Sequence, residues 1–256
     1  MKKLGYQDFA VLRRPLESGR QSPSSLAANL ILAVFLQVII HLAFYYLADS
    51  TNYPSIHQIR DVHLLATISI CVLSILFAIP PVYKRLGAIQ YLVSIIVSQN
   101  LFCIYPYIGG LILLGRNSQA TKDFLANFTT ITLEIGLLLF ILTFIRFIFL
   151  LNKGKYRKGG KKDQLRGTFE TDSYLPFVIA GGVGLVFVMQ YVIRSTGIED
   201  FGDFFFAMLL FAAFYTMIFV LPEQLVILYC KFRFKSFTFN ERGYLLDEDD
   251  RKRIKA

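Results

Sequence analysis

The sequence predicts an all-α fold: a polytopic transmembrane helical bundle of about six spans with both termini in the cytoplasm. Three observations lead to this prediction. Hydrophobic residues make up 55% of the 256 residues, whereas soluble domains contain about 45–50%. They are gathered in runs long enough to cross about 30 Å of hydrocarbon. The Lys and Arg residues lie mainly between these runs, and alternate connections carry very unequal numbers of them.

The predicted elements follow a simple order. Residues 1–24 form a polar, basic and amphipathic amino-terminal segment without the early apolar core and cleavage site of a removable signal peptide. The transmembrane domain covers residues 25–230, with spans predicted at 25–48, 63–82, 88–114, 124–151, 174–193 and 204–230. A basic loop, residues 152–173, joins the fourth and fifth spans, and residues 231–256 form a tail. The pieces outside the spans are each too short to build a hydrophobic core of their own.

The distribution of cations predicts the orientation. Of the 27 Lys and Arg residues, 22 lie in the amino-terminal segment, the turn at Lys84 and Arg85, the basic loop and the tail. The connections on the other side carry only Arg60, Arg116, Lys122 and Arg194. Because cytoplasmic loops carry the excess of Lys and Arg, we expect a multi-pass protein of the cell membrane whose basic pieces face the cytoplasm.

Composition and motifs exclude several classes of protein. The net charge of +9 would suit a nucleic-acid-binding protein, but the charges flank apolar runs, so a bilayer explains them better and no nucleic-acid partner is predicted. The sequence contains no nucleophile elbow, HExxH motif or phosphate-binding loop. Its three Cys residues are isolated and show no metal-ligand spacing. We therefore predict no catalytic residue, no metal site and no cofactor.

Polar side chains inside the predicted spans are the first group of candidate functional residues. They are Gln37, His41, Gln99, Asn100, Glu134, Arg146 and Glu223. Ionisable groups at membrane depth are costly and usually face the bundle interior or water. Arg146 and Glu223 lie at similar depth, roughly 10–12 Å inside the cytoplasmic boundary, so an ion pair could satisfy both. Alternatively, Pro222 ends the sixth span and begins an interfacial helix, with Glu223 near the positive helix start.

Two further interpretations concern the middle of the bundle. Gln37 and His41 share one helix face, and His41 lies within a turn of the depth of Glu134, so these two could form a proton-sensitive pair. The alternative is that they join helices by hydrogen bonds, or that burial keeps Glu134 protonated. Gln99 and Asn100 precede Pro106, Gly109 and Gly110, which together with the "AGGVG" of residues 180–184 favour close helix packing. A polar substrate path is the alternative.

Basic residues at the predicted cytoplasmic surface are the second group of candidates. They are Lys153, Lys155, Arg157, Lys158, Lys161, Lys162, Arg166, Lys231, Arg233 and Lys235. The glycines among the loop cations favour a flexible segment that lies against anionic headgroups. In "KFRFKSFTF", residues 231–239, Phe alternates with cations, which is typical of an anchor at the membrane surface. An acidic cytoplasmic partner is the alternative to the lipid.

The strings "LPEQLVILYCKFRFKSFTFN", residues 221–240, and "SPSSLAANL", residues 22–30, carry a family resemblance. The sequence resembles an uncharacterised multi-pass membrane-protein family of Gram-positive bacteria found beside type VII secretion genes. The resemblance implies a setting of secreted toxins and of membrane proteins that protect against them. We therefore expect a non-enzymatic protein that binds a membrane or secreted protein, such as an immunity or accessory factor. The alternative is a transport protein or a permease subunit of a small exporter, because such subunits also begin with a basic amphipathic segment.

Overall fold

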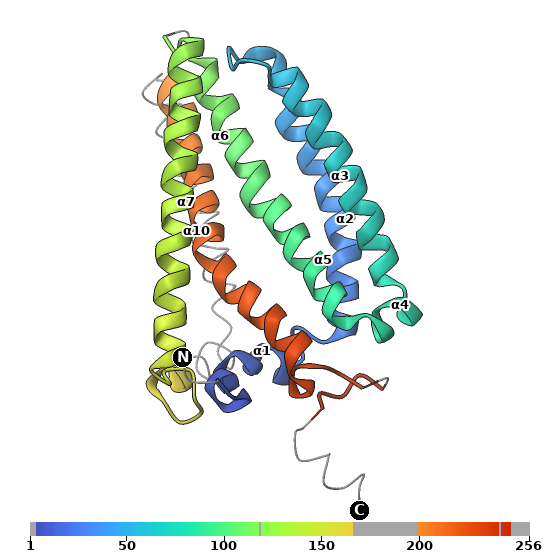
Figure 1. The fold of residues 1–256 in the computed structure, drawn as a ribbon. Coiled ribbons are helices and arrows are strands. Elements are labelled where there is room, and N and C mark those ends of the chain that lie inside the picture. The colour runs from blue at the N-terminus through green and yellow to red at the C-terminus, as the bar shows by residue number, and fades with distance from the viewer. Residues whose placement is uncertain (1–3, 118, 166–198, 241, 247–256) are drawn as a thin grey trace, which may run out of the picture.

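The computed structural model describes residues 4–117, 119–165, 199–240 and 242–246, which form a bundle of long helices (Figure 1). The described residues contain no strand, and one antiparallel bridge joins Phe239 to Leu245. Within this described part of the chain, five helices are long and apolar enough to cross a membrane. The predicted all-α bundle is confirmed, and the protein is an integral membrane protein.

The five spanning helices lie at or near the predicted positions. They are α2 (Pro23–Tyr46), α3 (Ile56–Ala78), α5 (Gly87–Gln99) with η3 (Asn100–Ile104) and α6 (Tyr105–Arg116), α7 (Lys122–Asn152) and α10 (Glu199–Arg233). The predicted span at 174–193 lies outside the described residues, so the sixth span stays a prediction. Figure 1 shows that α7 ends and α10 begins at opposite ends of the bundle, which is the connectivity that six crossings require.

Short helices connect and flank the spanning helices. They are η1 (Tyr6–Arg13), α1 (Arg14–Glu17), η2 (Ala48–Ser50), α4 (Pro80–Arg85) and η4 (Lys235–Phe237). Two spanning helices begin with side-chain caps, where the hydroxyl of Ser22 accepts from the Ser25 N–H and that of Thr121 from the Phe124 N–H. The α3 helix begins seven residues before the predicted span, because polar residues at a membrane surface can continue a helix without belonging to the apolar run.

Pro222 does not end the last helix. The α10 helix is continuous from Glu199 to Arg233 with Pro222 in its interior, so the prediction of an interfacial helix starting at Pro222 is wrong. A proline removes one helix hydrogen bond and costs about 3 kcal/mol in an isolated helix. Here the long apolar stretches on both sides favour a single membrane-spanning helix.

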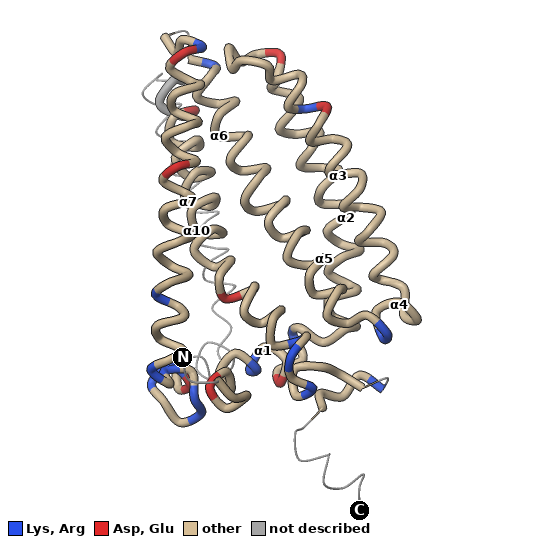
Figure 2. The backbone as a smooth tube through the Cα atoms, viewed as in Figure 1, with Lys and Arg blue, Asp and Glu red and all other residues tan. Residues whose placement is uncertain are grey.

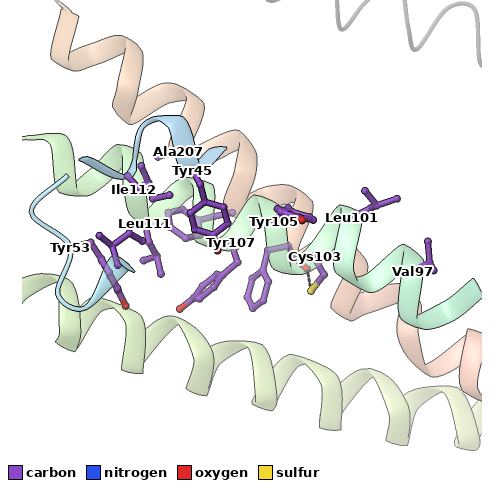
Figure 3. Packing of buried hydrophobic residues seen from close by; sticks show 14 of the residues in the cluster. Tyr45, Tyr53, Val97, Leu101, Cys103, Tyr105, Tyr107, Leu111, Ile112 and Ala207 are labelled. Atoms are coloured by element: carbon purple, nitrogen blue, oxygen red, sulfur yellow. Dashed lines mark hydrogen bonds between the residues drawn. The ribbon is translucent and has the colours of Figure 1, made fainter. Parts of the chain in front are cut away.

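The helix formed by α5, η3 and α6 is the centre of the bundle, with α2 and α3 on one side and α7 and α10 on the other (Figure 1). In its most apolar window 44% of residues are buried, against 11% for α7. Close packing was predicted at Gly109 and Gly110, and it is confirmed. An added Cβ would lie 2.1 Å from the Phe44 ring at Gly109 and 2.9 Å from the Phe211 ring at Gly110. Figure 3 shows part of this apolar core around Tyr105 and Leu111.

One end of the bundle carries a folded cap. We call it the inner end, because the charge distribution predicts that it is cytoplasmic, and Figure 2 shows its concentration of Lys and Arg. The inner cap consists of residues 4–21, 153–165, 234–240 and 242–246. Their apolar side chains share a core with the ends of α7 and α10, and its buried members include Phe9, Leu12, Leu16, Tyr156 and Phe237. Each piece was predicted to be too short for a core of its own, and the structure shows a core that the three pieces share with the helix ends.

Candidate functional site

A buried polar network crosses the interface between α2, α3 and the central helix. His63 on α3 is its middle member. The Tyr45 hydroxyl lies 2.8 Å from His63 Nδ1, and His63 Nε2 lies 2.9 Å from Asn100 Oδ1. Asn100 Nδ2 in turn donates to Gln37 Oε1 at 2.9 Å. When His63 is neutral and its Nε2–H donates to the amide oxygen, Nδ1 accepts a hydrogen bond from the Tyr45 hydroxyl. A continuous series of hydrogen bonds therefore connects Tyr45, His63, Asn100 and Gln37.

A second branch of the network is centred on Tyr105. Its hydroxyl lies 3.1 Å from His41 Nδ1 and 3.0 Å from Thr67 Oγ1. Thr67 Oγ1 also accepts a long hydrogen bond of 3.4 Å from Asn100 Nδ2, which connects the two branches. The centroids of the His41 and His63 rings are 6.0 Å apart. The His41 ring meets the Tyr105 ring edge-on, and the His63 ring is tilted against it. Three helices therefore contribute to one connected set of polar groups.

Burial makes these hydrogen bonds important for stability. Gln37 and Tyr105 are fully buried, and Asn100 is 1% exposed. A buried polar group without a partner costs about 1–3 kcal/mol, and in a bilayer no water is available to replace the partner. Among the described residues, Gln37 Nε2 is the network atom that is buried without a hydrogen bond. The network is therefore almost completely satisfied within the chain.

The π-helical turn η3 places the polar groups of the central helix. Asn100 begins η3, and Tyr105 follows its last residue. A π-turn inserts an extra residue into the helix and rotates the side chains on either side of it. Asn100 and Tyr105 consequently both reach the α2–α3 interface, while neighbouring Gln99 faces α10 and donates from Nε2 to Gln224 Oε1 at 3.2 Å.

Sequence reasoning found part of this network. Gln37, His41 and Asn100 are members, and the prediction that Gln37 and His41 act on one face is consistent with their positions. Tyr45, His63, Thr67 and Tyr105 were missed. His63 and Thr67 are four residues apart on α3, as Gln37 and His41 are on α2, and that spacing is a signal that could have found them.

The predicted pair of Glu134 and His41 is not formed. His41 contacts Tyr105 and Tyr45, whereas Glu134 is exposed on α7. The depth of the two residues was a sound argument, but α2 packs against α3 and the central helix, and α7 packs against α10 and α6. The central helix separates α2 from α7, and a sequence of hydrophobic runs does not reveal which helices are neighbours.

Arg146 and Glu223 lie near each other without forming the predicted ion pair. Both line a groove of about 420 Å³ between α7 and α10. No ion pair joins these two among the described residues, and the Arg146 side chain is exposed. The similar depth of the two residues was therefore predicted correctly, while their direct contact was not.

The basic loop is folded rather than flexible over residues 153–165. Arg157 pairs with Asp8 at 2.7 Å, Arg14 with Asp163 at 2.7 Å, and Lys158 with Glu17 at 3.5 Å. The hydrogen bond from Arg14, helped by the Gly159 backbone N–H at 2.9 Å, lowers the pKa of Asp163 below its ordinary value. Asp8 and Glu17 of the amino-terminal segment thus neutralise two of the loop cations, which the number of cations in the loop does not reveal. Arg166 lies outside the described residues.

Of the remaining described loop cations, two contact aromatic side chains and two are exposed without such a contact. Lys162 donates to the Tyr156 hydroxyl at 2.8 Å, and Lys153 lies over the Phe149 ring. Lys155 and Lys161 are exposed. Headgroup binding by these exposed cations stays a prediction.

The alternating Phe and cation segment is mostly folded onto the protein. Phe237 is fully buried and Lys231 is 6% exposed, whereas Phe232 is 63% exposed. Arg233 bonds to the Leu4 carbonyl and to the Tyr229 hydroxyl, and Lys235 is exposed. The Lys231 side chain turns inward from the end of α10 instead of lying on the outer surface, and its contact with headgroups stays a prediction.

Comparisons with protein-family models, with curated protein sequences and with solved structures found no match to this chain. The function is therefore argued from the geometry of this molecule.

Proposed function

We propose that this integral membrane protein is non-enzymatic and acts by binding another protein within the bilayer. The observation that carries the proposal is the position of Glu134. It lies about 18 Å from the start of α7, a helix about 46 Å long, and its side chain is exposed. A carboxylate at this depth faces hydrocarbon unless residues beyond the described part of the chain or another molecule cover it.

The outward surface of α7 around Glu134 is otherwise apolar. Ile131, Leu138 and Ile145 are each more than half exposed, and they recur at helical spacing beside Glu134. We call this surface the α7 outer face. Ionisable side chains in spanning helices usually face a protein interior or a water-filled cavity. An apolar face with one central carboxylate therefore fits a partner helix that offers a cation or a strong hydrogen-bond donor.

The rest of the chain offers little to neutralise Glu134. The predicted span at 174–193 contains no Lys, Arg or His, and the described cations lie near the ends of the bundle, apart from Arg146 lower on α7. The complementary group is therefore assigned to another protein. Under the family resemblance, this partner is a secreted toxin or a membrane component of its secretion machinery, and the chain is an immunity or accessory factor.

Purification from native membranes in mild detergent tests this function. Wild type should co-purify a specific protein, and Glu134→Leu should lose it because the complementary charge is gone. Leu65→Ala on α3 is the matched control, since Leu65 is 68% exposed on another helix. The same set of co-purifying proteins from all three preparations would contradict the proposal.

Transport is a second candidate function, and the buried network is the observation that favours it. Two titratable rings, His41 and His63, are connected through Tyr105 and Asn100 inside the membrane. Connected polar groups of this kind form proton relays in transporters. Reconstituted vesicles with an imposed proton gradient distinguish the two: proton flux that His63→Gln abolishes would support transport, and no flux would leave protein binding as the function.

A further inference from the structure

A basic pocket lies at the inner end of the bundle, between the starts of α2 and α5 and the end of α10. Its volume is about 430 Å³, which is within the range of small-molecule sites. Four cations line it: Lys84, Arg85, Lys231 and Arg242. None of the described lining residues is acidic, and Glu241 lies outside the described residues. The pocket therefore combines a small volume with charges that are all positive among its described lining residues.

Lys231 is the buried member of this set. Its side chain is 6% exposed, and its ammonium group donates one long hydrogen bond of 3.4 Å to the Phe237 carbonyl. It also lies 5.1 Å from the Tyr91 ring and 5.4 Å from the Phe239 ring. No described carboxylate forms an ion pair with it. A buried ammonium group has three donors and is costly without a counter-charge, so the chain leaves a place for an anion.

The start of α5 adds backbone donors to the same pocket. Gly87, Ala88 and Ile89 form its first turn and line the pocket. The N-cap residue is Leu86, and no side chain caps this helix. The first N–H groups of a helix lack partners within the helix, and together with the helix dipole they favour anions, phosphate above all. The backbone donors, like the cations, therefore favour the binding of an anion in this pocket.

The position of the pocket matches that of phospholipid headgroups. It lies where three spanning helices begin or end, and the exposed side chains of Phe232 and Leu86, with half-buried Ile89, give it an apolar edge. Residues 238–240, 242 and 243 line its other side, and the Leu246 N–H donates to the Thr238 carbonyl beside them. A ligand with an anionic head and an apolar body would place its head near the cations of the pocket and its body along the apolar edge.

We infer that this pocket is a binding site for a phosphate-bearing anion at the inner membrane surface. Lys231 and the first turn of α5 hold the phosphate from within the pocket, and Arg85 and Arg242 contact it from the rim. The source of the phosphate is either the headgroup of an anionic phospholipid or a soluble phosphate compound. The inference is independent of the proposed protein partner, because the pocket and the α7 outer face involve different helices.

Thermal unfolding of the full-length, delipidated protein in neutral detergent tests the inference. The probes are dioctanoyl phosphatidylglycerol, zwitterionic dioctanoyl phosphatidylcholine and inorganic phosphate. We expect phosphatidylglycerol to raise the midpoint and to appear as a bound adduct in native mass spectrometry, and phosphatidylcholine to act weakly. A rise with inorganic phosphate alone would assign a soluble ligand, whereas a rise with phosphatidylglycerol alone would assign a headgroup.

Matched variants make the test specific. Arg85→Gln with Arg242→Gln removes two rim cations and should weaken the apparent affinity for the effective probe at least about tenfold. Lys155→Gln with Lys161→Gln removes the same charge from exposed positions outside the pocket and should leave the affinity nearly unchanged. Lys231→Met, which keeps the length of the side chain, should abolish the stabilisation. No midpoint shift with any probe, or equal weakening in the two double variants, would overturn the inference.

Discussion

The polar groups on the α2–α3 side and those on α7 differ in how they are satisfied within the membrane. On the α2–α3 side, Gln37, His63 and Asn100 are buried and bonded to one another. On α7, Glu134 and Arg146 are exposed at membrane depth. The first region satisfies its polar groups within the chain, so it stabilises the fold. The second region is incomplete in the described structure, and this difference points to α7 as the surface where another molecule binds.

Asn100→Ala should have the largest effect on stability. It removes the acceptor for His63 and the donor to Gln37, so buried partners are left unsatisfied. We expect a loss of about 2 kcal/mol in the free energy of unfolding, measured by denaturation in detergent. Ser69→Ala is the control, because its hydroxyl is exposed and bonds only to the Leu65 carbonyl of its own helix. If both variants unfold at the same midpoint, the network does not support the fold.

Tyr45→Phe should have a smaller effect of the same kind. It removes one hydroxyl that bonds to His63 and leaves the ring in place. We expect the free energy of unfolding to fall by about 1 kcal/mol, or by about 0.6 kcal/mol if this hydrogen bond is as weak as the average one between membrane helices. The neighbouring Tyr46→Phe is a matched control, because Tyr46 is 85% exposed. Equal unfolding midpoints for the two variants would show that the Tyr45–His63 bond contributes nothing.

The inner cap should depend on pH through Asp163. Because the pKa of Asp163 is lowered in the folded state, its contribution is complete above the unfolded value of about 3.9 and is lost as the pH falls further. The temperature midpoint of unfolding should therefore decrease when the pH is lowered below about 4. The decrease should be smaller in Asp163→Asn, which lacks the carboxylate. Asp61→Asn, an exposed acid at the other end, should follow wild type. Identical profiles for wild type and Asp163→Asn would contradict this role.

Glu134→Leu should not reduce the stability of the isolated protein. The side chain is exposed, and replacing a charge at membrane depth by Leu removes a cost of about 2.5–3.5 kcal/mol on insertion scales. Unfolding in micelles, where water reaches the carboxylate, should change by less than about 0.5 kcal/mol. Asn100→Ala should show the reverse pattern, with lower stability but retained partner binding in the folded fraction. A strong loss of stability in Glu134→Leu would place Glu134 in the fold rather than in an interface.

Sequence could predict the five described spans and some of the polar residues in the buried network, but not the partners of these residues. Hydrophobic runs and helix caps are local, so α2 and α7 were found within two residues at each end. The neighbours of α7, the π-turn before Tyr105 and the inward turn of Lys231 depend on packing between distant segments. The pairs of Asp8 with Arg157 and of Arg14 with Asp163 each join residues 149 positions apart. No period or spacing in the sequence encodes such contacts.

Site-specific photo-crosslinking in native membranes tests the central claim most directly. A photoreactive phenylalanine at Leu138, one turn from Glu134 on the α7 outer face, should give an adduct of higher mass that contains a second protein. The same residue at Leu65, which is similarly exposed on α3, should give none. No intermolecular adduct at Leu138, or the same adduct at both positions, would contradict the claim that α7 binds a protein partner in the bilayer.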